Sequence, residues 1–436
     1  MEPERKEKRL PWLLRPLGRF LDSLSAGSLT LSLPDGRSWH YGPAWKSEPK
    51  ATLHIRHPVR FMSRLTRGSL GLADAYLAAD WDSPDLAVLL ELLDRTQTEK
   101  PHGRGRHRPF ALLDRIELAL RGNSLAGSRR NIGAHYDLGL DFFESWLDPT
   151  LCYSCAHFDP DRPDEELETA QRRKIRHIFE RLDPAPGTRL LEIGSGFGAF
   201  ALEAAERGLS VDSLTLSKTQ LDYAQRQARV RGLEARAHFD YRDYRLSQGD
   251  YDAVVSIEMF EAVGEHYWPT YFRVLRDRLK AGGKAVLQVI TIDSAAYADY
   301  RRQPDFIQLR VFPGGMLPTW GHLERLATET GFSIRDPDFR GADYARTLGF
   351  WLESFDRAWP TLARRGYPAR LGRLWRYYLA YCRAGFETRR VDLVQFTLEA
   401  QYSSPKEADP VQPAGTPPRI RLKDSAAPPD RPRSSS

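Results

Sequence analysis

Residues 190–198 read Leu190-Leu191-Glu192-Ile193-Gly194-Ser195-Gly196-Phe197-Gly198, an apolar run that breaks into glycines directly before a helical pattern from Ala199 to Arg207. A strand, a glycine-rich turn and a helix in this order are typical of nucleotide binding, because glycine lets the backbone approach a ligand closely. The spacing is not the Gly-x-Gly-x-x-Gly of dinucleotide enzymes, and Glu192 stands before the turn. This arrangement suits a ligand without a pyrophosphate, such as S-adenosylmethionine, and a glycine turn without any ligand is the alternative.

The flanking sequence predicts an α/β fold. Further apolar runs alternate with helical stretches, and Ser217 stands where it would cap a helix from Lys218 to Arg231. Strands that alternate with helices at this spacing form a parallel sheet with helices on both faces, and ligands bind at the C-terminal ends of the strands. We therefore expect the glycine turn and the segments after Ile257 and Ile290 to converge on one crevice. The predicted strands are 190–193, 211–217, 251–257 and 284–290.

Separate motifs follow one another along the chain: Tyr153-Ser154-Cys155-Ala156, Leu191 to Gly198, Leu214 to Ser217 with Gln220, Met259 to Gly264, Phe312 to Gly315, Asp343 to Leu348 and Tyr377 to Ala380. Taken in this order, they resemble the motifs of the cyclopropane fatty acid synthases and their mycolic acid relatives. The resemblance runs from about Asn131 to Gln401. It implies a Rossmann-like class I methyltransferase with a mostly parallel sheet.

The segment from Ala295 to about Arg389 is long for a sheet crossover and is mostly helical in pattern. We expect it to form a lid over the crevice that presents Tyr344, because the implied chemistry needs a pocket closed to water. A helical insertion without substrate contact is the alternative.

The resemblance implies an enzyme that transfers a methylene or methyl group from S-adenosylmethionine to the cis double bond of unsaturated acyl chains in phospholipids. The alkene would take the sulfonium methyl, a carbocation would form, and loss of a proton would close a cyclopropane ring. A related lipid C-methyltransferase that gives methyl- or methylene-branched chains is one alternative, and a small-molecule methyltransferase is another. A lipid- or cofactor-binding protein without turnover is a third.

The resemblance also implies a bound bicarbonate ion that serves as the base. Its ligands in the family map onto Cys155, Glu261, Tyr344 and the main chain of Ile290, while Gln288 stands at the family's histidine position. An amide donates a hydrogen bond to an oxyanion, but it does not carry a positive charge or shuttle a proton as imidazole does. This departure leaves open whether the product is a ring or a branched chain.

The family's cofactor contacts also map onto this chain. Tyr153 and Ser154 fall at the methionine end, and the turn is expected to contribute Glu192, Gly194, Gly196 and Gly198. The adenosine is expected to contact Thr215, Leu216 and Gln220, and the adenine to be enclosed by Tyr241 and Arg242, although a solvated side chain is an equal reading for Arg242. No metal site is expected.

Aromatic side chains and cysteines admit other readings. Aromatic faces stabilise cations, and the candidates by type are Phe142, Phe143, Trp146, Tyr271, Phe272, Phe312, Trp351 and Phe355, each of which is otherwise plain core. Cys152 and Cys155 form a Cys-x-x-Cys pair, but a zinc site lacks further ligands and a redox pair lacks its helix. The three cysteines and the absence of a signal peptide predict a reducing compartment.

Composition divides the chain into parts. We expect an N-terminal accessory domain of small mixed structure over residues 1–100, which resembles the lipid-contacting domain of full-length cyclopropane synthases. A linker and helix over 101–130 and a catalytic domain over 131–402 follow. Residues 403–436 are rich in proline, serine and charge and are expected to be a disordered tail.

Charge predicts where the protein works. No run approaches the roughly 18 apolar residues that span a bilayer, the net charge is +6, and basic residues cluster beside apolar ones at 5–19, 104–121 and 364–383. Such surfaces suit anionic lipid headgroups, so we expect a cytoplasmic protein peripherally associated with the inner face of the membrane. No nucleic-acid-binding motif is present, which argues against that partner. A homodimer stays open.

Overall fold

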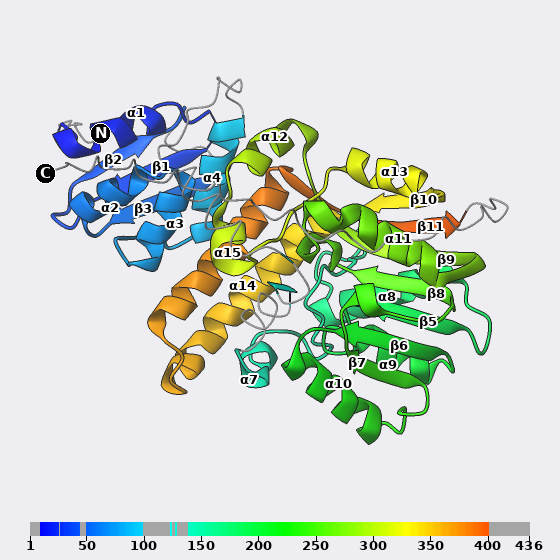
Figure 1. The fold of residues 1–436 in the computed structure, drawn as a ribbon. Coiled ribbons are helices and arrows are strands. Elements are labelled where there is room, and N and C mark those ends of the chain that lie inside the picture. Colours follow the sequence, from blue (N-terminus) through cyan, green and yellow to red (C-terminus); the bar gives the residue numbers. More distant parts are fainter. Residues whose placement is uncertain are drawn as a thin grey trace, which may run out of the picture. The chain divides into compact units, whose positions relative to one another are not determined.

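The computed structural model describes residues 9–25, 27–43, 49–98, 123, 127–128 and 138–400 (Figure 1). Its centre is a seven-stranded sheet in the order β10-β11-β9-β8-β5-β6-β7. The strands from β5 to β9 pair in parallel, whereas β11 pairs antiparallel with both β9 and β10. The predicted α/β architecture, Rossmann-like and mostly parallel, is confirmed. The strands are β5 (Arg189–Ile193), β6 (Ser210–Thr215), β7 (Ala237–Tyr241), β8 (Tyr251–Ile257), β9 (Leu279–Ile292), β10 (Phe332–Phe339) and β11 (Val391–Ala400).

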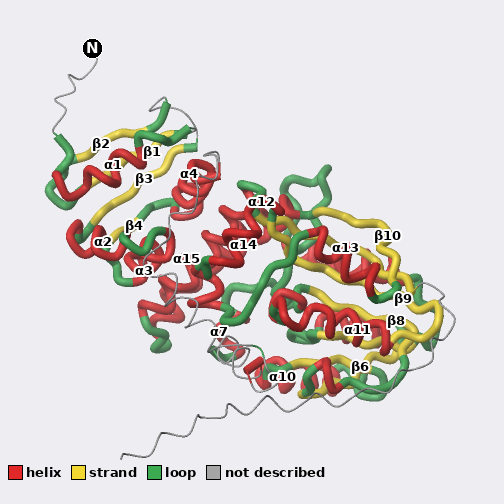
Figure 2. Tube along the Cα trace, turned by 45° about the horizontal axis from the view of Figure 1, so that its top comes forward, coloured by secondary structure: helices red, strands yellow, loops and turns green. Residues whose placement is uncertain are grey.

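Helices cover both faces of this sheet (Figure 2). One face packs against α8 (Leu167–Leu182), α9 (Ala199–Glu206) and α10 (Lys218–Val230), and the other against α11 (Trp268–Arg278) and α13 (Trp320–Glu329). The predicted cap of α10 is confirmed, since Ser217 Oγ accepts a hydrogen bond from the Gln220 N–H at 3.3 Å. The alternation of side chains along β5 explains the two layers, because Leu190 packs on one face and Leu191 on the other.

The predicted helical insertion is correct in its second half. Helices α14 (Gly341–Arg364) and α15 (Ala369–Glu387) form an antiparallel hairpin that presents Tyr344. The expectation of a mostly helical segment is wrong for β10, which joins the edge of the sheet. This strand contains Pro337 and a register shift between Arg335 and Asp338, and proline is tolerated only at a sheet edge or a bulge. Shorter elements here are α12 (Ser294–Arg302) and η5 (Ile307–Val311).

The N-terminal residues form a sheet of their own. Its four strands lie in the order β2-β1-β3-β4, and β1 pairs in parallel with β3. Helices and strands are mixed here as expected, but residues up to Gln401 cluster as one compact unit, so a separate N-terminal domain stays a prediction. The elements are η1 (Trp12–Leu14), α1 (Arg15–Leu21), β1 (Ser28–Ser32), β2 (Ser38–Tyr41), β3 (Lys50–Ile55), α2 (Pro58–Leu65), α3 (Ser69–Leu77), β4 (Trp81–Asp82) and α4 (Leu86–Thr98).

Arginine 373 joins this N-terminal sheet to α15. Its guanidinium donates to the carbonyl oxygens of Tyr76 at 2.5 Å and Trp81 at 2.9 Å, and it pairs with Asp82 at 3.2 Å. The same guanidinium stacks over the Tyr76 ring, with its carbon 3.8 Å from the ring centroid. Arg390 makes a second link, because its Nε contacts both oxygens of Asp94 on α4.

The structure does not test the expected contact with a membrane surface. The 364–383 cluster was expected to suit anionic lipid headgroups; its aromatic residues Trp375, Tyr377 and Tyr378 are buried, and contact with lipid stays a prediction. Trp375 packs on Phe142, whereas Tyr377 packs on Tyr76 and Phe306, so α15 is buried on more than one side. No helix among the described residues could cross a membrane. The linker and the tail lie outside the described residues, apart from 123 and 127–128, as do the basic cluster at 104–121 and the first residues of the cluster at 5–19.

Candidate functional site

The C-terminal ends of the parallel strands open onto one cavity of about 310 Å³. The glycine turn after β5 lines it, together with residues that follow β6, β8 and β9. Phe312, Tyr378 and Tyr381 from the insertion line it as well. The predicted convergence of the turn with the segments after Ile257 and Ile290 is therefore seen in the structure.

The glycine turn is shaped for a ligand. The N–H groups of Gly194 and Ser195 both donate to Leu214 O, at 2.9 and 3.0 Å. Gly196 has a φ of +49°, and a Cβ placed there would meet nothing within 4 Å, so this side of the turn faces open space. The Ser195 hydroxyl is buried and has no hydrogen-bond partner among the described residues. An open turn with an unsatisfied hydroxyl in a lined cavity fits the S-adenosylmethionine that the sequence predicts.

Glu192 lies on β5 just before the turn and lines the cavity. Ser213 Oγ donates to its carboxyl at 2.5 Å. Burial raises the pKa of Glu192 to about 8, and the Ser213 hydrogen bond opposes that rise only in part. A carboxyl held this way would gain its charge most easily beside a cation, and S-adenosylmethionine carries both a sulfonium and an ammonium.

The predicted adenosine contacts are only partly together. Thr215, Leu216, Gln220 and Arg242 line the cavity, and Thr215 Oγ1 donates to Gln220 Oε1 at 3.0 Å. Tyr241 does not line it and is 36% exposed.

Gly198 is likewise absent from the cavity lining. A Cβ on it would come within 3.0 Å of Ala224 and 3.1 Å of Phe239. Gly198 therefore serves the close packing of α9 against its neighbours.

The predicted anion site is built around a residue that the sequence analysis did not select, Glu258. One of its carboxyl oxygens accepts hydrogen bonds from the Cys155 N–H and from Gln288 Nε2, both at 2.8 Å. The other oxygen accepts from the Tyr344 hydroxyl at 2.6 Å. Glu258 also lines the cavity. Three groups expected to hold bicarbonate thus converge on a carboxylate of the chain itself.

Local structure fixes this carboxylate. Glu258 directly follows β8, and its backbone is left-handed, with a φ of +49°, which is uncommon for a residue with a Cβ. Its N–H donates to Gln288 O at 2.8 Å, which anchors the turn to β9. Tyr344 is held from α14 by stacking on Phe386, with ring centroids 4.3 Å apart. Gln288 is in turn held by Gln395 of β11, whose amide donates to its oxygen at 3.0 Å.

Burial and hydrogen bonding shift the pKa of Glu258 in opposite directions, and the pKa is raised overall. Burial raises its pKa, while the hydrogen bonds from Tyr344, Gln288 and the Cys155 N–H lower it. The same carboxylate and burial raise the pKa of the Tyr344 hydroxyl well above its usual value. Tyr344 therefore acts as a hydrogen-bond donor, and its phenol stays protonated.

Glu261, the predicted glutamate, lies beside this cluster. Its Oε1 accepts from the Ile290 N–H at 2.5 Å, and it lines the cavity. Burial and the nearby Glu258 raise its pKa to about 8. Its second oxygen is buried without a hydrogen-bond partner among the described residues. Two carboxyls this close do not both ionise easily, and the pKa values of Glu258 and Glu261 are both raised.

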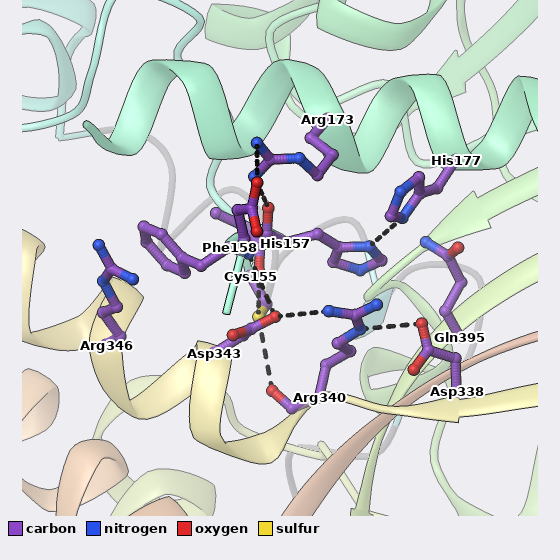
Figure 3. Close-up of polar contacts among 12 residues, drawn as sticks. Cys155, His157, Phe158, Arg173, His177, Asp338, Arg340, Asp343, Arg346 and Gln395 are labelled. Carbon is purple, nitrogen blue, oxygen red and sulfur yellow. Dashed lines mark hydrogen bonds and ion pairs between the residues drawn. The ribbon is translucent and has the colours of Figure 1, made fainter. Parts of the chain in front are cut away.

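The Cys155 thiol lies beside Arg340 and Asp343 (Figure 3). Its sulfur donates to Ala156 O at 3.1 Å and lies 4.0 Å from Arg340 O, while only its backbone N–H reaches the carboxylate. Behind it Arg340 pairs with Asp338 and Asp343, at 2.8 and 3.2 Å. The predicted role of Cys155 as a ligand thus rests on its main chain.

No donor of this cluster is left for a separate bicarbonate ion. The Cys155 N–H, Gln288 and Tyr344 all contact Glu258, and the Ile290 N–H contacts Glu261. An anion placed among them would also face two carboxyls. The residues present therefore do not fit a bicarbonate ion in this arrangement.

The aromatic candidates divide between the cavity and the core. Phe312 lines the cavity, whereas Tyr271 and Phe272 pack under the sheet with Phe260. A cluster of rings lies next to Tyr153, whose hydroxyl donates to the Tyr378 hydroxyl at 2.8 Å. Its other members are Phe142, Phe143, Trp146, Trp351, Phe355 and Trp375.

The sequence analysis did not select two polar residues of the site, although the sequence around each one indicates its position. Glu258 is an acidic residue at the end of the apolar run 251–257, where a parallel strand meets its ligand. Lys174 lies on α8 among the buried Gln171, Ile175 and Ile178, at spacings that share one helix face. No group of residues within the described ranges could hold a metal ion, and their cysteines are free.

Comparison with known proteins assigns the chain to a family. The family model described as mycolic acid cyclopropane synthetase matches residues 123–396. Tuberculostearic acid methyltransferase UfaA1 of Mycobacterium tuberculosis is 36% identical over 81% of this chain and 84% of its own length. Cyclopropane-fatty-acyl-phospholipid synthase of Escherichia coli is 33% identical over 81% of this chain and 89% of its own.

A solved structure shares the fold. Mycolic acid cyclopropane synthase CmaA1, complexed with SAH and CTAB, superposes with a TM-score of 0.56 at 29% identity, over 62% of this chain and 98% of that one. The family match, the two relatives and the turn that fits the cofactor lead to one conclusion. The chain belongs to the mycolic acid cyclopropane synthetase family and is an S-adenosylmethionine-dependent methyltransferase.

Proposed function

We propose that the protein transfers a one-carbon unit to the double bond of an unsaturated fatty acyl chain, with Glu258 as the proton acceptor. The observation that carries this proposal is the Glu258 carboxylate, which faces the cavity and is held by Cys155 N–H, Gln288 and Tyr344. The names of the relatives support a fatty acyl substrate.

The reaction balances with one proton released. S-adenosylmethionine supplies an electrophilic methyl group when it is bound. One alkene carbon takes this methyl, the methyl–sulfur bond breaks, and the other alkene carbon becomes a cation. A proton then leaves the new methyl group, and Glu258 accepts it. Phe312, Tyr378 and the other lining side chains keep water from the cation.

A carboxylate within the chain replaces the bicarbonate that the family resemblance implied. Both are oxyanions, and the groups expected to hold the ion instead hold Glu258. Gln288 suits this role because an amide N–H orients a carboxylate without neutralising it.

We propose a branched chain as the product and the cyclopropane ring as the second candidate. The branch forms if a hydride shifts from the methylated carbon to the cation before the methyl proton leaves, which gives a methylene-branched chain. The ring forms if the proton leaves first. Gln288 at the family's histidine position and the 36% identity to a tuberculostearic acid methyltransferase favour the branch. The family itself and the synthase at 33% identity favour the ring.

We propose phospholipid acyl chains at a membrane surface as the substrate. The net charge of +6 suits anionic headgroups. Incubation with unsaturated phospholipid vesicles and S-adenosylmethionine should give acyl chains that are heavier by one CH₂ group. The cyclopropane chain and the methylene-branched chain have the same mass. Proton NMR of the acyl esters distinguishes them. Activity on soluble substrates alone would argue for a small-molecule methyltransferase.

Substitution of the base tests the mechanism. Glu258→Gln keeps the size of the side chain and removes its basicity, so we expect turnover to fall by about 10²- to 10⁴-fold while S-adenosylhomocysteine binds with unchanged affinity. Glu265→Gln is the control, because Glu265 pairs with Arg301 at the surface, and it should keep full turnover. Activity of the wild type that depends on added bicarbonate would contradict Glu258 as the base.

A further inference from the structure

Lys174 is a buried side chain whose hydrogen-bond partners are neutral, although its charge also acts at longer range on Asp148 and Glu258. Its side chain comes from α8, is 1% exposed, and lines the same cavity as Glu192 and Gly194. Its Nζ donates to Ser154 Oγ at 2.6 Å and to Gln171 Oε1 at 2.7 Å. Both partners are neutral, and no carboxylate among the described residues forms an ion pair with it.

Such an arrangement is costly unless a ligand completes it. Buried charges in proteins are almost always paired, and an unpaired one is destabilising by several kcal/mol. An ammonium group has three N–H donors, and two of those of Lys174 are used by the protein. One donor and one full positive charge remain for a ligand in the cavity.

We propose that Lys174 is the counter-charge for the carboxylate of the cofactor's methionine end, with Ser154 placed beside it. This inference rests on the assignment of S-adenosylmethionine as the cofactor. The carboxylate is the one anionic group of that molecule. Glu192 lies on β5 and also lines the cavity. Its carboxyl is suited to the cationic groups of the same ligand. Lys174 would bind the carboxylate of the methionine end, and Glu192 would lie near its cationic groups.

A purely structural role for Lys174 predicts something different. Gln171 Nε2 donates to Ser154 O at 2.8 Å, so α8 also ties down the loop that carries Tyr153, Ser154 and Cys155. If Lys174 only supports this loop, its loss should disturb every ligand that the loop touches. If it binds the carboxylate, its loss should affect only ligands that have one.

A pair of ligands separates these roles. S-adenosylhomocysteine carries the amino acid, and 5′-methylthioadenosine has the same adenosine and thioether without it. For Lys174→Met, calorimetric titration should show S-adenosylhomocysteine binding weakened by about 10- to 100-fold and 5′-methylthioadenosine binding unchanged. Equal weakening of both ligands, or unchanged binding of S-adenosylhomocysteine, would overturn the proposal.

Two further variants keep the test decisive. Gln171→Leu removes the tie to Ser154 O and one acceptor of Lys174 but leaves the charge, so it should weaken both ligands alike. Lys174→Gln serves if the methionine variant does not fold, with the same expectation. The unliganded Lys174→Met protein should melt at the same temperature as the wild type or higher, because an unpaired buried charge has been removed. These measurements use no acyl substrate, so they are independent of Glu258 and of the proposed reaction.

Discussion

A single backbone conformation gives the site its base. Glu258 has a left-handed φ at the end of β8, and this turns its side chain toward Tyr344 and Gln288. Strain of this kind persists only where surrounding contacts hold it, and here three hydrogen bonds and the anchor to Gln288 O do so. The strand end thus presents a carboxylate to the cavity at a fixed position.

Glu192 makes the stability of the unliganded protein depend on pH. Its pKa is about 8 in the folded protein and near 4.5 in the unfolded chain. Between these values the folded state keeps a proton that the unfolded state has lost, so stability falls as the pH rises through this window. Glu192→Gln removes this loss and should be more stable than the wild type near pH 8, by roughly 4 kcal/mol.

Urea unfolding at about pH 5 and about pH 8.5 measures this difference. At the lower pH the carboxyl is protonated in the folded state, and the variant should gain much less. Glu261 has a raised pKa too, so part of the pH dependence should remain in the variant. Glu234→Gln at an exposed position is the control. A variant whose advantage is the same at both pH values would refute the buried-proton explanation.

The sequence predicted several cavity-lining residues correctly, but it did not identify Glu258. Gly194, Gly196, Leu216 and Tyr344 line the cavity as expected, whereas Gly198 does not. Glu261 was chosen as the ligand, although Glu258 makes the contacts. The two glutamates lie three residues apart, and only the local backbone angle decides which one faces the cluster.

At the scale of elements, the α14–α15 hairpin depends on close approach at Gly372. A Cβ at this helical position would overlap the Trp359 ring of α14. Gly372→Ala should therefore separate the helices and destabilise the protein by about 1 to 3 kcal/mol.

The matched control is Gly349→Ala in α14. A Cβ there would meet Arg383 at 3.7 Å, an ordinary contact, and alanine favours the helix by about 0.5 to 1 kcal/mol. Thermal unfolding should show the two substitutions moving the midpoint in opposite directions. A lower midpoint for both would mean that glycine is needed in this hairpin for another reason.

Elements with strong local signals were predicted well. The apolar run 251–257 coincides with β8, and the Ser217 cap fixes the start of α10. β10 was missed because its sequence holds Pro337 and charged residues, and it becomes a strand only by pairing with β11. Tertiary pairing of this kind has no local signature.

For the whole molecule, Arg373 is the main polar link between the N-terminal sheet and the helical hairpin. Arg373→Met would remove the guanidinium donor from the carbonyl groups of Tyr76 and Trp81 and the ion pair with Asp82, while Tyr76 O would keep its hydrogen bond from the Ala79 N–H. We expect a loss of about 2 to 4 kcal/mol and a separate, earlier unfolding transition for the N-terminal residues in calorimetry.

Arg370→Met, at an exposed position on the same helix, should leave a single transition. A single transition with an unchanged midpoint in Arg373→Met would show that apolar contacts alone join the two parts. The sequence predicted the N-terminal sheet as a separate unit, but it gave no sign of this link, because residues 76 and 373 are distant in the chain.

The place of β11 in the sheet affects how the protein is made. This last strand inserts between β9 and β10 and pairs with both. During synthesis both neighbours would wait with bare edges until the ribosome has delivered residues 391–400. A nascent chain interrupted before Val391 would leave the edges of β9 and β10 unpaired, and unpaired strand edges form hydrogen bonds with other chains and promote aggregation.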